Sequence, residues 1–337
     1  MNGTLLDQHD VVLLDLDGTV YRGGELIASA GAAIRQARQC SVALRYVTNN
    51  AATPSESVAE RLTGMGLPTE APEVSTSAQA AAALLAESLP AGSAVLVVGT
   101  EALAAEVRDR GLVPVSAYED GPDAVVQGHS PDTGWRQLAE GCLSLRDGAL
   151  WIACNSDVTL PSERGSLPGN GSMVTALQAA TGREPRFAGK PRRPLMDRAV
   201  ASAQGQAPLV VGDRLETDIA GAVEAGMPAL LVLTGVDDPA GTLFAEPEMR
   251  PRYVAEDVAA LHRCPEESVI SEHSGWKVRV DDSTVELAAA SEADHDRLSA
   301  LRALCAAWWP VGSGHVRVRA RDARAASALR RLGWEQR

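Results

Sequence analysis

Residues 11–19, which read VVLLDLDGT, decide the fold of this chain. Four apolar residues run into two acids and a glycine, a pattern typical of a buried parallel strand that ends in a loop. Side chains alternate along an extended chain, so Leu16 lies on one side, and Asp15 and Asp17 on the other. Two neighbouring carboxylates repel each other unless a cation binds. Because a buried strand precedes these acids and Gly-Thr follows them, we favour a cation site over a loop with solvated acids.

Outward from this stretch, apolar strands alternate with helical segments as far as residue 233. Strands are predicted at 42–47, 94–98, 124–127, 149–154, 208–211 and 228–233. Helices are predicted at 28–39, 55–65, 101–110, 133–145, 172–181, 194–204 and 217–225. The composition is 45% apolar but only 4% aromatic, which suits parallel sheets covered by alanine-rich helices. We therefore expect an α/β fold with parallel layers.

The character of the chain changes after residue 265. Residues 265–267 are interpreted as a linker, and a small module follows it. Strands are expected at 276–280, 284–289 and 315–319, with a hairpin turn at 281–283, and helices at 294–308 and 322–332. The tryptophans Trp308, Trp309 and Trp334 indicate either a core or an interface for this module. We expect the module to help subunits associate into a homo-oligomer.

The bulk properties exclude several classes of partner. A formal net charge of −13 repels nucleic-acid backbones and anionic membranes, so neither is expected as a partner. An anionic substrate would then need local positive charge from a metal ion, a lysine or helix N-termini. The 5 cysteines form no C-x-x-C pair and are expected to be free thiols. Acids interrupt the N-terminal stretch and no apolar run is long enough to span a bilayer, so we expect a soluble, cytoplasmic protein.

Three further polar clusters come after predicted strands. Those at 48–50 and 212–218 follow their strands directly, whereas the one at 189–191 lies further from the strand before it. Residues 48–50 read TNN, residues 189–191 read GKP, and residues 212–218 read GDRLETD. Thr48 and the two asparagines either hold phosphate oxygens or cap the next helix. Lys190 sits in a tight loop from which its ammonium group can reach a site. Ligands of open parallel sheets bind at the carboxyl ends of the strands, where these clusters are expected.

Taken in order, DLDGT, TNN, GKP and GDRLETD resemble the four sequence motifs of the haloacid dehalogenase-type phosphatases, across about residues 8–262. Roughly 140 residues separate the second motif from the third, which resembles the NagD-like branch with a large α/β cap. The segments at 153–157 and 168–172 are also similar to that branch. The resemblance implies a Rossmann-like doubly wound parallel-sheet core at 1–80 and 186–262, a cap domain at 81–185, and a GNAT-related α+β module at 268–337.

For the C-terminal module the resemblance to the GNAT acetyltransferase fold is loose. A glycine-rich pyrophosphate loop before a helix is lacking, and Gly312 and Gly314 precede a predicted strand instead. We therefore do not predict chemistry with acetyl-CoA.

The resemblance also implies roles for particular residues. Asp15 would attack phosphorus and form an aspartyl-phosphate, and Asp17 would act as the acid and base. Mg²⁺ would be held by Asp15, Asp213 and the backbone carbonyl of Asp17, and it would offset charge in the transition state. Asp218 would stabilise the helix N-terminus or orient Lys190. The phosphate site would comprise Gly18, Thr48, Asn49, Asn50 and Lys190.

Substrate choice would lie in the cap. Asn155 and Asp157 either contact substrate hydroxyls or cap local turns, and the same alternatives apply to His129. The segment 155–172 is rich in glycine, proline and serine and is expected to be a loop. The whole chain resembles glycerol-3-phosphate phosphatases with a GNAT-related tail, so we favour glycerol 3-phosphate as the small phosphorylated metabolite. The alternatives are phosphoglycolate, pyridoxal phosphate or a nucleotide, and, in another class, a non-catalytic phosphate-binding interaction protein.

Overall fold

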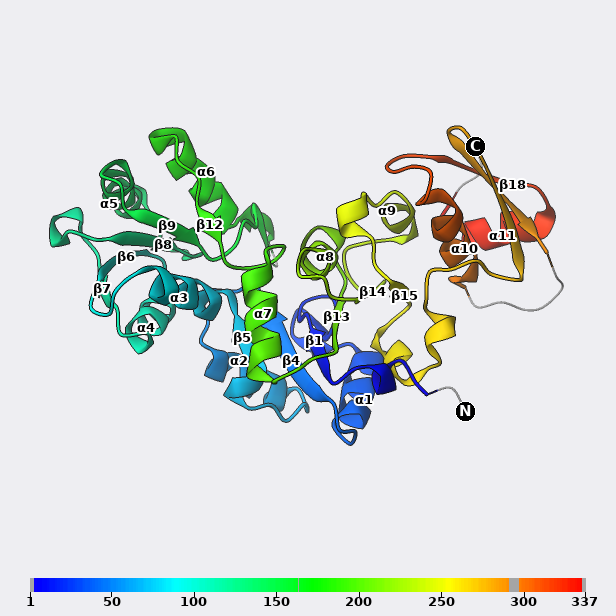
Figure 1. Cartoon of the computed structure of the whole chain (residues 1–337), viewed down its shortest axis with the longest axis horizontal. Helices are drawn as coiled ribbons and strands as arrows, with labels where there is room; N and C mark the ends of the chain where they lie inside the picture. The colour runs from blue at the N-terminus through cyan, green and yellow to red at the C-terminus, as the bar shows by residue number, and fades with distance from the viewer. Residues whose placement is uncertain (1–2, 163, 291–296, 335–337) are drawn as a thin grey trace. The chain divides into compact units, whose positions relative to one another are not determined.

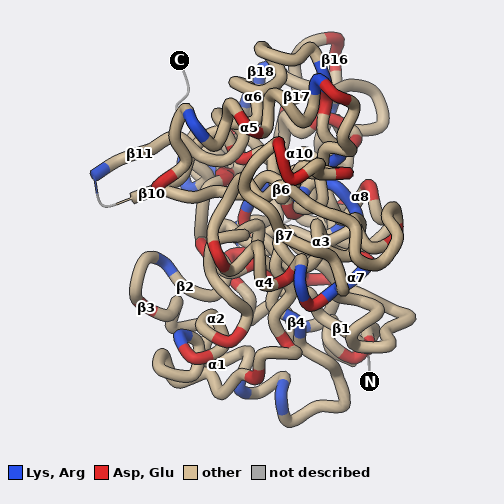
Figure 2. The backbone as a smooth tube through the Cα atoms, turned by 90° about the vertical axis from the view of Figure 1, so that its left-hand side faces the viewer, with Lys and Arg blue, Asp and Glu red and all other residues tan. Residues whose placement is uncertain are grey.

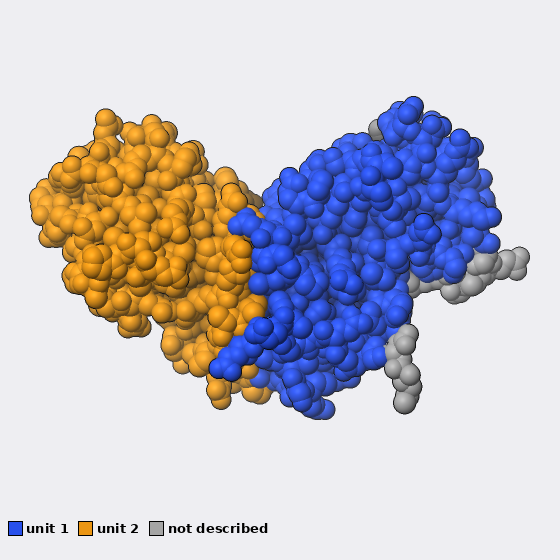
Figure 3. Space-filling model, in the orientation of Figure 1, with its two compact units in different colours: residues 1–44, 203–337 blue, residues 45–202 orange. Residues whose placement is uncertain are grey.

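The computed structural model describes residues 3–162, 164–290 and 297–334. The chain divides into two compact units, which Figure 3 colours separately. Unit 1 comprises Met1–Leu44 and Ala203–Arg337, and unit 2 comprises Arg45–Ser202. Charged residues of both signs are spread along the backbone of both units (Figure 2). Each unit is a layered α/β structure, as predicted (Figure 1).

Unit 1 contains a parallel sheet that includes the apolar run at the start of the chain. Its strands follow the order β15 (Tyr253–Ala255), β14 (Ala229–Val232), β13 (Pro208–Gly212) and β1 (Val11–Leu14). Neighbouring strands are parallel, with Leu14 opposite Val211. Every residue of β1 is fully buried, as expected where helices cover both faces of a parallel sheet. The acids that follow β1 and β13 therefore emerge at the same edge of this sheet.

Next to this sheet in the chain come the ten-residue helix α1 (Ala28–Ala37) and two five-residue helices, α8 (Ala220–Glu224) and α9 (Pro239–Leu243). The helix predicted at 217–225 begins earlier, and its first turn, Leu215–Ile219, is π-helical before α8 continues. Such turns are frequent at functional sites. A two-stranded ribbon that the sequence analysis missed, β2 (Tyr21–Arg22) and β3 (Glu25–Leu26), follows the first acidic motif.

The C-terminal module has a three-stranded sheet with helices, close to its predicted form. Strands β16 (Trp276–Asp281) and β17 (Thr284–Ala289) are antiparallel, and β18 (Arg317–Ala320) is parallel to β17. The predicted hairpin is confirmed, and Asp282 in its turn takes a left-handed conformation with φ of 43°. Helices α10 (Ser299–Trp308) and α11 (Ala323–Arg331) pack on the sheet. Of the helix predicted at 294–308, residues 294–296 lie outside the described residues.

Unit 2 holds a strand pair and a second parallel sheet. Strand β4 (Ala43–Thr48), in which the unit boundary falls, is parallel to β5 (Val74–Thr76). The second sheet has the order β12 (Arg186–Phe187), β9 (Leu150–Ala153), β8 (Ala124–Gln127), β6 (Ala94–Val98) and β7 (Val113–Val115). The helices of unit 2 are α2 (Ser55–Gly64), α3 (Ser77–Ser88), α4 (Glu101–Asp109), α5 (Trp135–Arg146), α6 (Asn170–Thr181) and α7 (Arg193–Ser202). Trp151 is buried in a cluster between the second sheet, α5 and α6.

The expectation of a plain loop at 155–172 is wrong in part. An antiparallel ribbon, β10 (Thr159–Ser162) and β11 (Gly165–Pro168), occupies its middle. Strand β11 begins at Gly165, whose φ of 111° lies in the region that favours glycine, so this glycine serves a ribbon and not a plain loop. In the described residues, no helix is long and apolar enough to cross a membrane.

Candidate active site

Three carboxylates gather at the sheet edge of unit 1. Asp15 follows β1, Asp213 follows β13, and Asp218 lies in the π-helical turn. One carboxylate oxygen from each lies within 4.8 Å of the others. Asp213 and Asp218 are each 2% exposed, and Leu16 is 3% exposed, so alternation does turn Leu16 into the core. Three acids this close repel each other, which is a costly arrangement for a metal-free protein.

The chemistry of this cluster fits a small divalent cation. Mg²⁺ prefers oxygen ligands and is usually held by one or two carboxylates with water and substrate oxygens. The cluster offers oxygen ligands from Asp15, Asp213 and Asp218, two of them buried. Asp218 was expected in a supporting role, and its Oδ2 does accept a bond of 3.2 Å from the backbone N–H of Arg214 at the start of the turn.

A loop after β14, residues 233–238, surrounds the Asp213 carboxylate, and the sequence analysis missed it; we call it the cradle loop, or the cradle. The backbone N–H of Val236 donates to Asp213 Oδ2 at 2.8 Å. A Cβ on Gly235 would lie 1.8 Å from the same oxygen, and a Cβ on Gly18 would lie 2.4 Å from it. Thr234 Oγ1 donates to the carbonyl of Gly18 at 2.6 Å, which joins the two glycine segments. A side chain at either position would therefore collide with the Asp213 carboxylate.

Asp237 belongs to the same loop. Its Oδ2 accepts a bond of 2.6 Å from the backbone N–H of Leu215, the first residue of the π-helical turn. Burial raises the pKa of Asp237, although the Leu215 bond acts in the opposite direction. The loop therefore supports both buried acids of the cluster, Asp213 directly and Asp218 through its turn.

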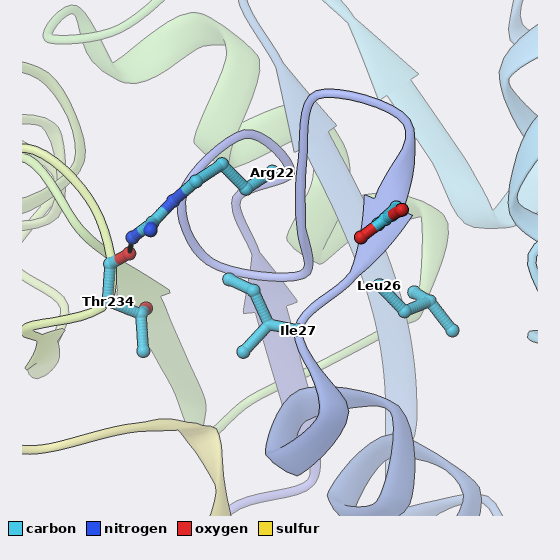
Figure 4. Close-up of a pocket in the computed structure, with 5 residues that line it drawn as sticks. Arg22, Leu26, Ile27 and Thr234 are labelled. Carbon is cyan, nitrogen blue, oxygen red and sulfur yellow. Dashed lines mark hydrogen bonds between the residues drawn. The ribbon is translucent and has the colours of Figure 1, made fainter.

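Asp17 is exposed, in contrast to the buried acids. It precedes the β2–β3 ribbon, whose Arg22 donates to the carbonyl of Thr234 in the cradle loop. Arg22, Glu25, Leu26, Ile27 and Thr234 line a small pocket beside this contact (Figure 4). The ribbon is thus tied to the loop that holds Asp213.

In unit 2, Asn49 organises the other predicted site residues. Its Oδ1 accepts a bond of 2.8 Å from the backbone N–H of Lys190, and its Nδ2 donates to the Lys190 carbonyl at 3.0 Å. Nδ2 also lies 3.2 Å from both carboxylate oxygens of Asp157. The Asn49 carbonyl accepts bonds from Asn155 Nδ2 at 2.7 Å and from Ser77 Oγ at 2.6 Å. Asn49 therefore joins the loop after β4 to the loops that carry Lys190 and Asp157.

Lys190 is 3% exposed, although lysine is rarely buried to this extent. Its Nζ donates to the carbonyl of Val47 at 3.2 Å. A Cβ on Gly189 would lie 2.5 Å from Asn49 Oδ1 and from the Cys154 carbonyl, so the glycine lets the loop approach closely. A buried, oriented ammonium group is a ready partner for an anion.

The remaining predicted residues make local contacts. Thr48 Oγ1 accepts the Asn50 N–H at 3.1 Å, and Asn50 Oδ1 accepts the Ala52 N–H at 2.7 Å. Asn155 Oδ1 accepts the Asp157 N–H at 3.2 Å. These are the turn-capping contacts that the sequence analysis weighed as one alternative. The substrate contacts of these residues, and of His129, stay predictions.

We expect Asn49 to matter more for stability than its neighbour Asn50. Replacing Asn49 with alanine removes bonds to both Lys190 and Asp157, so the free energy of unfolding is expected to fall by about 2–4 kcal/mol. Replacing Asn50 with alanine removes only short-range bonds and is expected to cost about 1 kcal/mol or less. Unfolding in urea measures both variants. Equal losses would contradict the organising role of Asn49.

Comparisons with known proteins match most of the chain. A family model for haloacid dehalogenase-like hydrolases matches residues 12–113, and a HAD-hydrolase-like model matches residues 187–261. A model for a GCN5-related N-acetyltransferase-like domain matches residues 273–334.

Individual relatives extend this likeness. D-glycerol 3-phosphate phosphatase of Mycobacterium tuberculosis is 46% identical, over 97% of this chain and 95% of that protein. The 5′-nucleotidase YutF of Bacillus subtilis is 37% identical, over 66% of this chain and 87% of that protein. A crystal structure of glycerol phosphate phosphatase from Mycobacterium tuberculosis in complex with magnesium matches with a TM-score of 0.95 and 46% identity, over 99% of this chain and 100% of that chain.

Proposed function

Because the chain belongs to the haloacid dehalogenase-like hydrolases, we propose that it is a magnesium-dependent phosphatase acting on glycerol 3-phosphate. The observation that carries the phosphatase proposal is the cluster of Asp15, Asp213 and Asp218 at one sheet edge. The substrate proposal is supported by the full-length likeness to a D-glycerol 3-phosphate phosphatase. The intact pair Asp15 and Asp17 argues against a non-catalytic phosphate-binding protein, which has no need of the acid/base.

We assign the first step to Asp15. Its carboxylate attacks the phosphorus of the ester, a P–O bond to the leaving alkoxide breaks, and an aspartyl-phosphate forms. Asp17 gives its proton to the leaving oxygen. In the second step Asp17 takes a proton from a water molecule, and the water oxygen attacks the phosphorus. The bond between phosphorus and Asp15 then breaks, which releases inorganic phosphate and restores the Asp15 carboxylate. The exposure of Asp17 suits a group that exchanges protons with water.

The other residues bind and orient. Asp15, Asp213 and the Asp17 carbonyl would hold Mg²⁺, which when bound neutralises negative charge between carboxylate and phosphate. Asp218 keeps the turn beside Asp213 in place. We assign Thr48 and Lys190 to the phosphoryl oxygens, with Gly18, Asn49 and Asn50 as further members of that site. Asn155 and Asp157 are assigned to the cap side of the substrate site.

The domain division and the assembly state also stay proposals. We keep the catalytic core at 1–80 and 186–262, the cap at 81–185 and the GNAT-related module at 268–337. Association of subunits through that module is likewise proposed, although Trp276 and Trp308 are each 7% exposed and therefore belong to its core.

A panel of phosphate esters tests the substrate. We expect the highest kcat/KM for glycerol 3-phosphate, at least about tenfold above phosphoglycolate, pyridoxal phosphate and a nucleoside 5′-monophosphate, because hydroxyl-reading sites reject analogues that leave polar groups unpaired. The nucleotide is the second candidate, since a 5′-nucleotidase is among the relatives. Release of inorganic phosphate is the readout. Equal rates on all four esters would contradict a glycerol phosphate site.

A further inference from the structure

Arg250 joins the core of unit 1 to the C-terminal module. Its Nη1 donates to the carbonyl of Trp309 at 2.7 Å, and its Nη2 donates to the carbonyl of Gly312 at 2.6 Å. Its Nε donates to the carbonyl of Ala245 at 3.1 Å, and its guanidinium carbon lies 5.4 Å from the centre of the Trp309 ring. Burial lowers the pKa of Arg250, but arginine stays protonated at any ordinary pH. One cation thus fixes the segment after α10 against the segment after α9.

The module makes further contacts with the same short stretch of the core. Trp309 Nε1 donates to the carbonyl of Leu243, the last residue of α9, at 3.1 Å. The ring centroids of Phe244 and His315 lie 4.2 Å apart. Helices α9 and α10 also pack together. Three consecutive residues, 243–245, are therefore held by the module and by Arg250.

The other end of this stretch is the cradle of Asp213. Val236 donates to the Asp213 carboxylate, and the backbone N–H of Asp237 donates to the Asp213 carbonyl at 3.2 Å. Asp238 then caps α9 by accepting the Gly241 N–H at 2.8 Å. Helix α9 is five residues long, or about 7.5 Å at 1.5 Å per residue. Because a helix this short leaves little room for bending, a shift at Leu243 is expected to reach the loop that holds Asp213.

We propose that the C-terminal module is a positioning element for the acidic cluster. Arg250 and Trp309 hold α9, and α9 holds the loop that fixes the Asp213 carboxylate. Without the contacts of Arg250 and Trp309, the cradle loop opens more often, and the Asp213 carboxylate is oriented toward a cation for less of the time. The inference rests on the proposed role of Asp213 in binding Mg²⁺, and it gives the module a task within one chain, beside any part in association.

Two variants and a matched control test this in the full-length protein. Arg250→Met removes the cation and its donors, whereas Trp309→Phe removes only the bond to Leu243 and keeps a ring over Arg250. The control is Arg302→Met, because Arg302 in α10 is 3% exposed and donates to the carbonyl of Val254 in β15 at 3.4 Å, outside the cradle and α9. The control therefore disturbs the docking of the module at a different place.

The first readout is the dissociation constant for Mg²⁺ from titration calorimetry. Replacing a residue that contacts a metal ligand usually costs 10–100-fold in metal affinity. Arg250 acts on Asp213 only through α9 and the loop before it, so for Arg250→Met we expect a smaller effect, about a fivefold increase in the dissociation constant for Mg²⁺. For Trp309→Phe we expect roughly a twofold increase. The constant for Arg302→Met should stay at the wild-type value even where its melting temperature falls. Wild-type affinity in both test variants, or an equal loss in the control, would overturn the proposal.

The second readout is hydrogen exchange of residues 234–245 in the metal-free protein. Exchange should be faster in Arg250→Met and Trp309→Phe than in the wild type, and unchanged in Arg302→Met. This readout separates two failures. If the wild-type protein does not bind Mg²⁺, the proposed function fails, yet faster exchange in the two variants still supports the coupling of the module to the cradle. Unchanged exchange in both variants overturns that coupling.

Discussion

Replacing Asp15 with asparagine is expected to lower kcat on an aryl phosphate by at least about 10⁴-fold, as loss of a nucleophile does in other enzymes. An amide oxygen is neutral and a poor nucleophile, so the covalent step has no route. The fold should survive, because the change also removes one of three mutually repelling charges from the cluster with Asp213 and Asp218. In the metal-free state the variant is therefore expected to melt at or above the wild-type temperature.

Asp7→Asn is the matched control for that experiment. Asp7 lies before β1 and accepts a bond of 2.7 Å from the backbone N–H of Thr4. Its replacement changes the charge of the chain by the same amount, but should leave kcat within about twofold, as surface substitutions away from a site do. Turnover retained by Asp15→Asn, with the Asp7→Asn value as reference, would remove Asp15 from the role of nucleophile.

Removal of the metal ion is expected to have the second large effect on phosphatase activity. Dialysis against a chelator is expected to lower phosphatase activity by at least about 10³-fold, since a bound cation supplies several kcal/mol of charge stabilisation. Adding Mg²⁺ should restore activity. Mg²⁺ should also raise the melting temperature, because binding to the folded state at about 100 times the dissociation constant stabilises it by roughly 2.7 kcal/mol.

Asp213→Asn separates the metal from other effects of the chelator. This variant keeps the acceptor oxygen for the Val236 N–H but loses the charge. The Mg²⁺-dependent rise in melting temperature should shrink or vanish in it. An enzyme that works equally well with and without chelator would refute the metal role, whatever the variant does.

The strands that carry the acids were predictable, because their signal is local. An apolar run that meets Asp15 or Asp213 marks the end of a buried strand, and β1 and β13 are found where this signal places them. The cradle of Asp213 was not predictable in the same way. Gly235 and Val236 lie more than 20 residues further along the chain, and their contacts depend on the backbone path of a loop. The glycine just past strand β14 was the available signal.

Asn49 and the module tryptophans illustrate the same limit. Residues 48–50 indicated a polar cluster, but their sequence could not tell Asn49, which joins three loops, from Asn50, which makes local contacts. Trp308 and Trp309 are adjacent in the sequence, yet one is buried in the module and the other contacts Arg250 in the core. Very short strands such as β2 and β3 were missed because two residues show no periodicity.

The most direct test of the account is to trap the covalent intermediate. The protein is mixed with Mg²⁺ and glycerol 3-phosphate, quenched in acid within milliseconds, digested and examined by mass spectrometry. We predict one phosphoryl group on the peptide that contains residues 11–19, attached at Asp15 and absent in Asp15→Asn. Turnover of the substrate with no phosphoryl group on that peptide, or with one on another residue, would contradict the account.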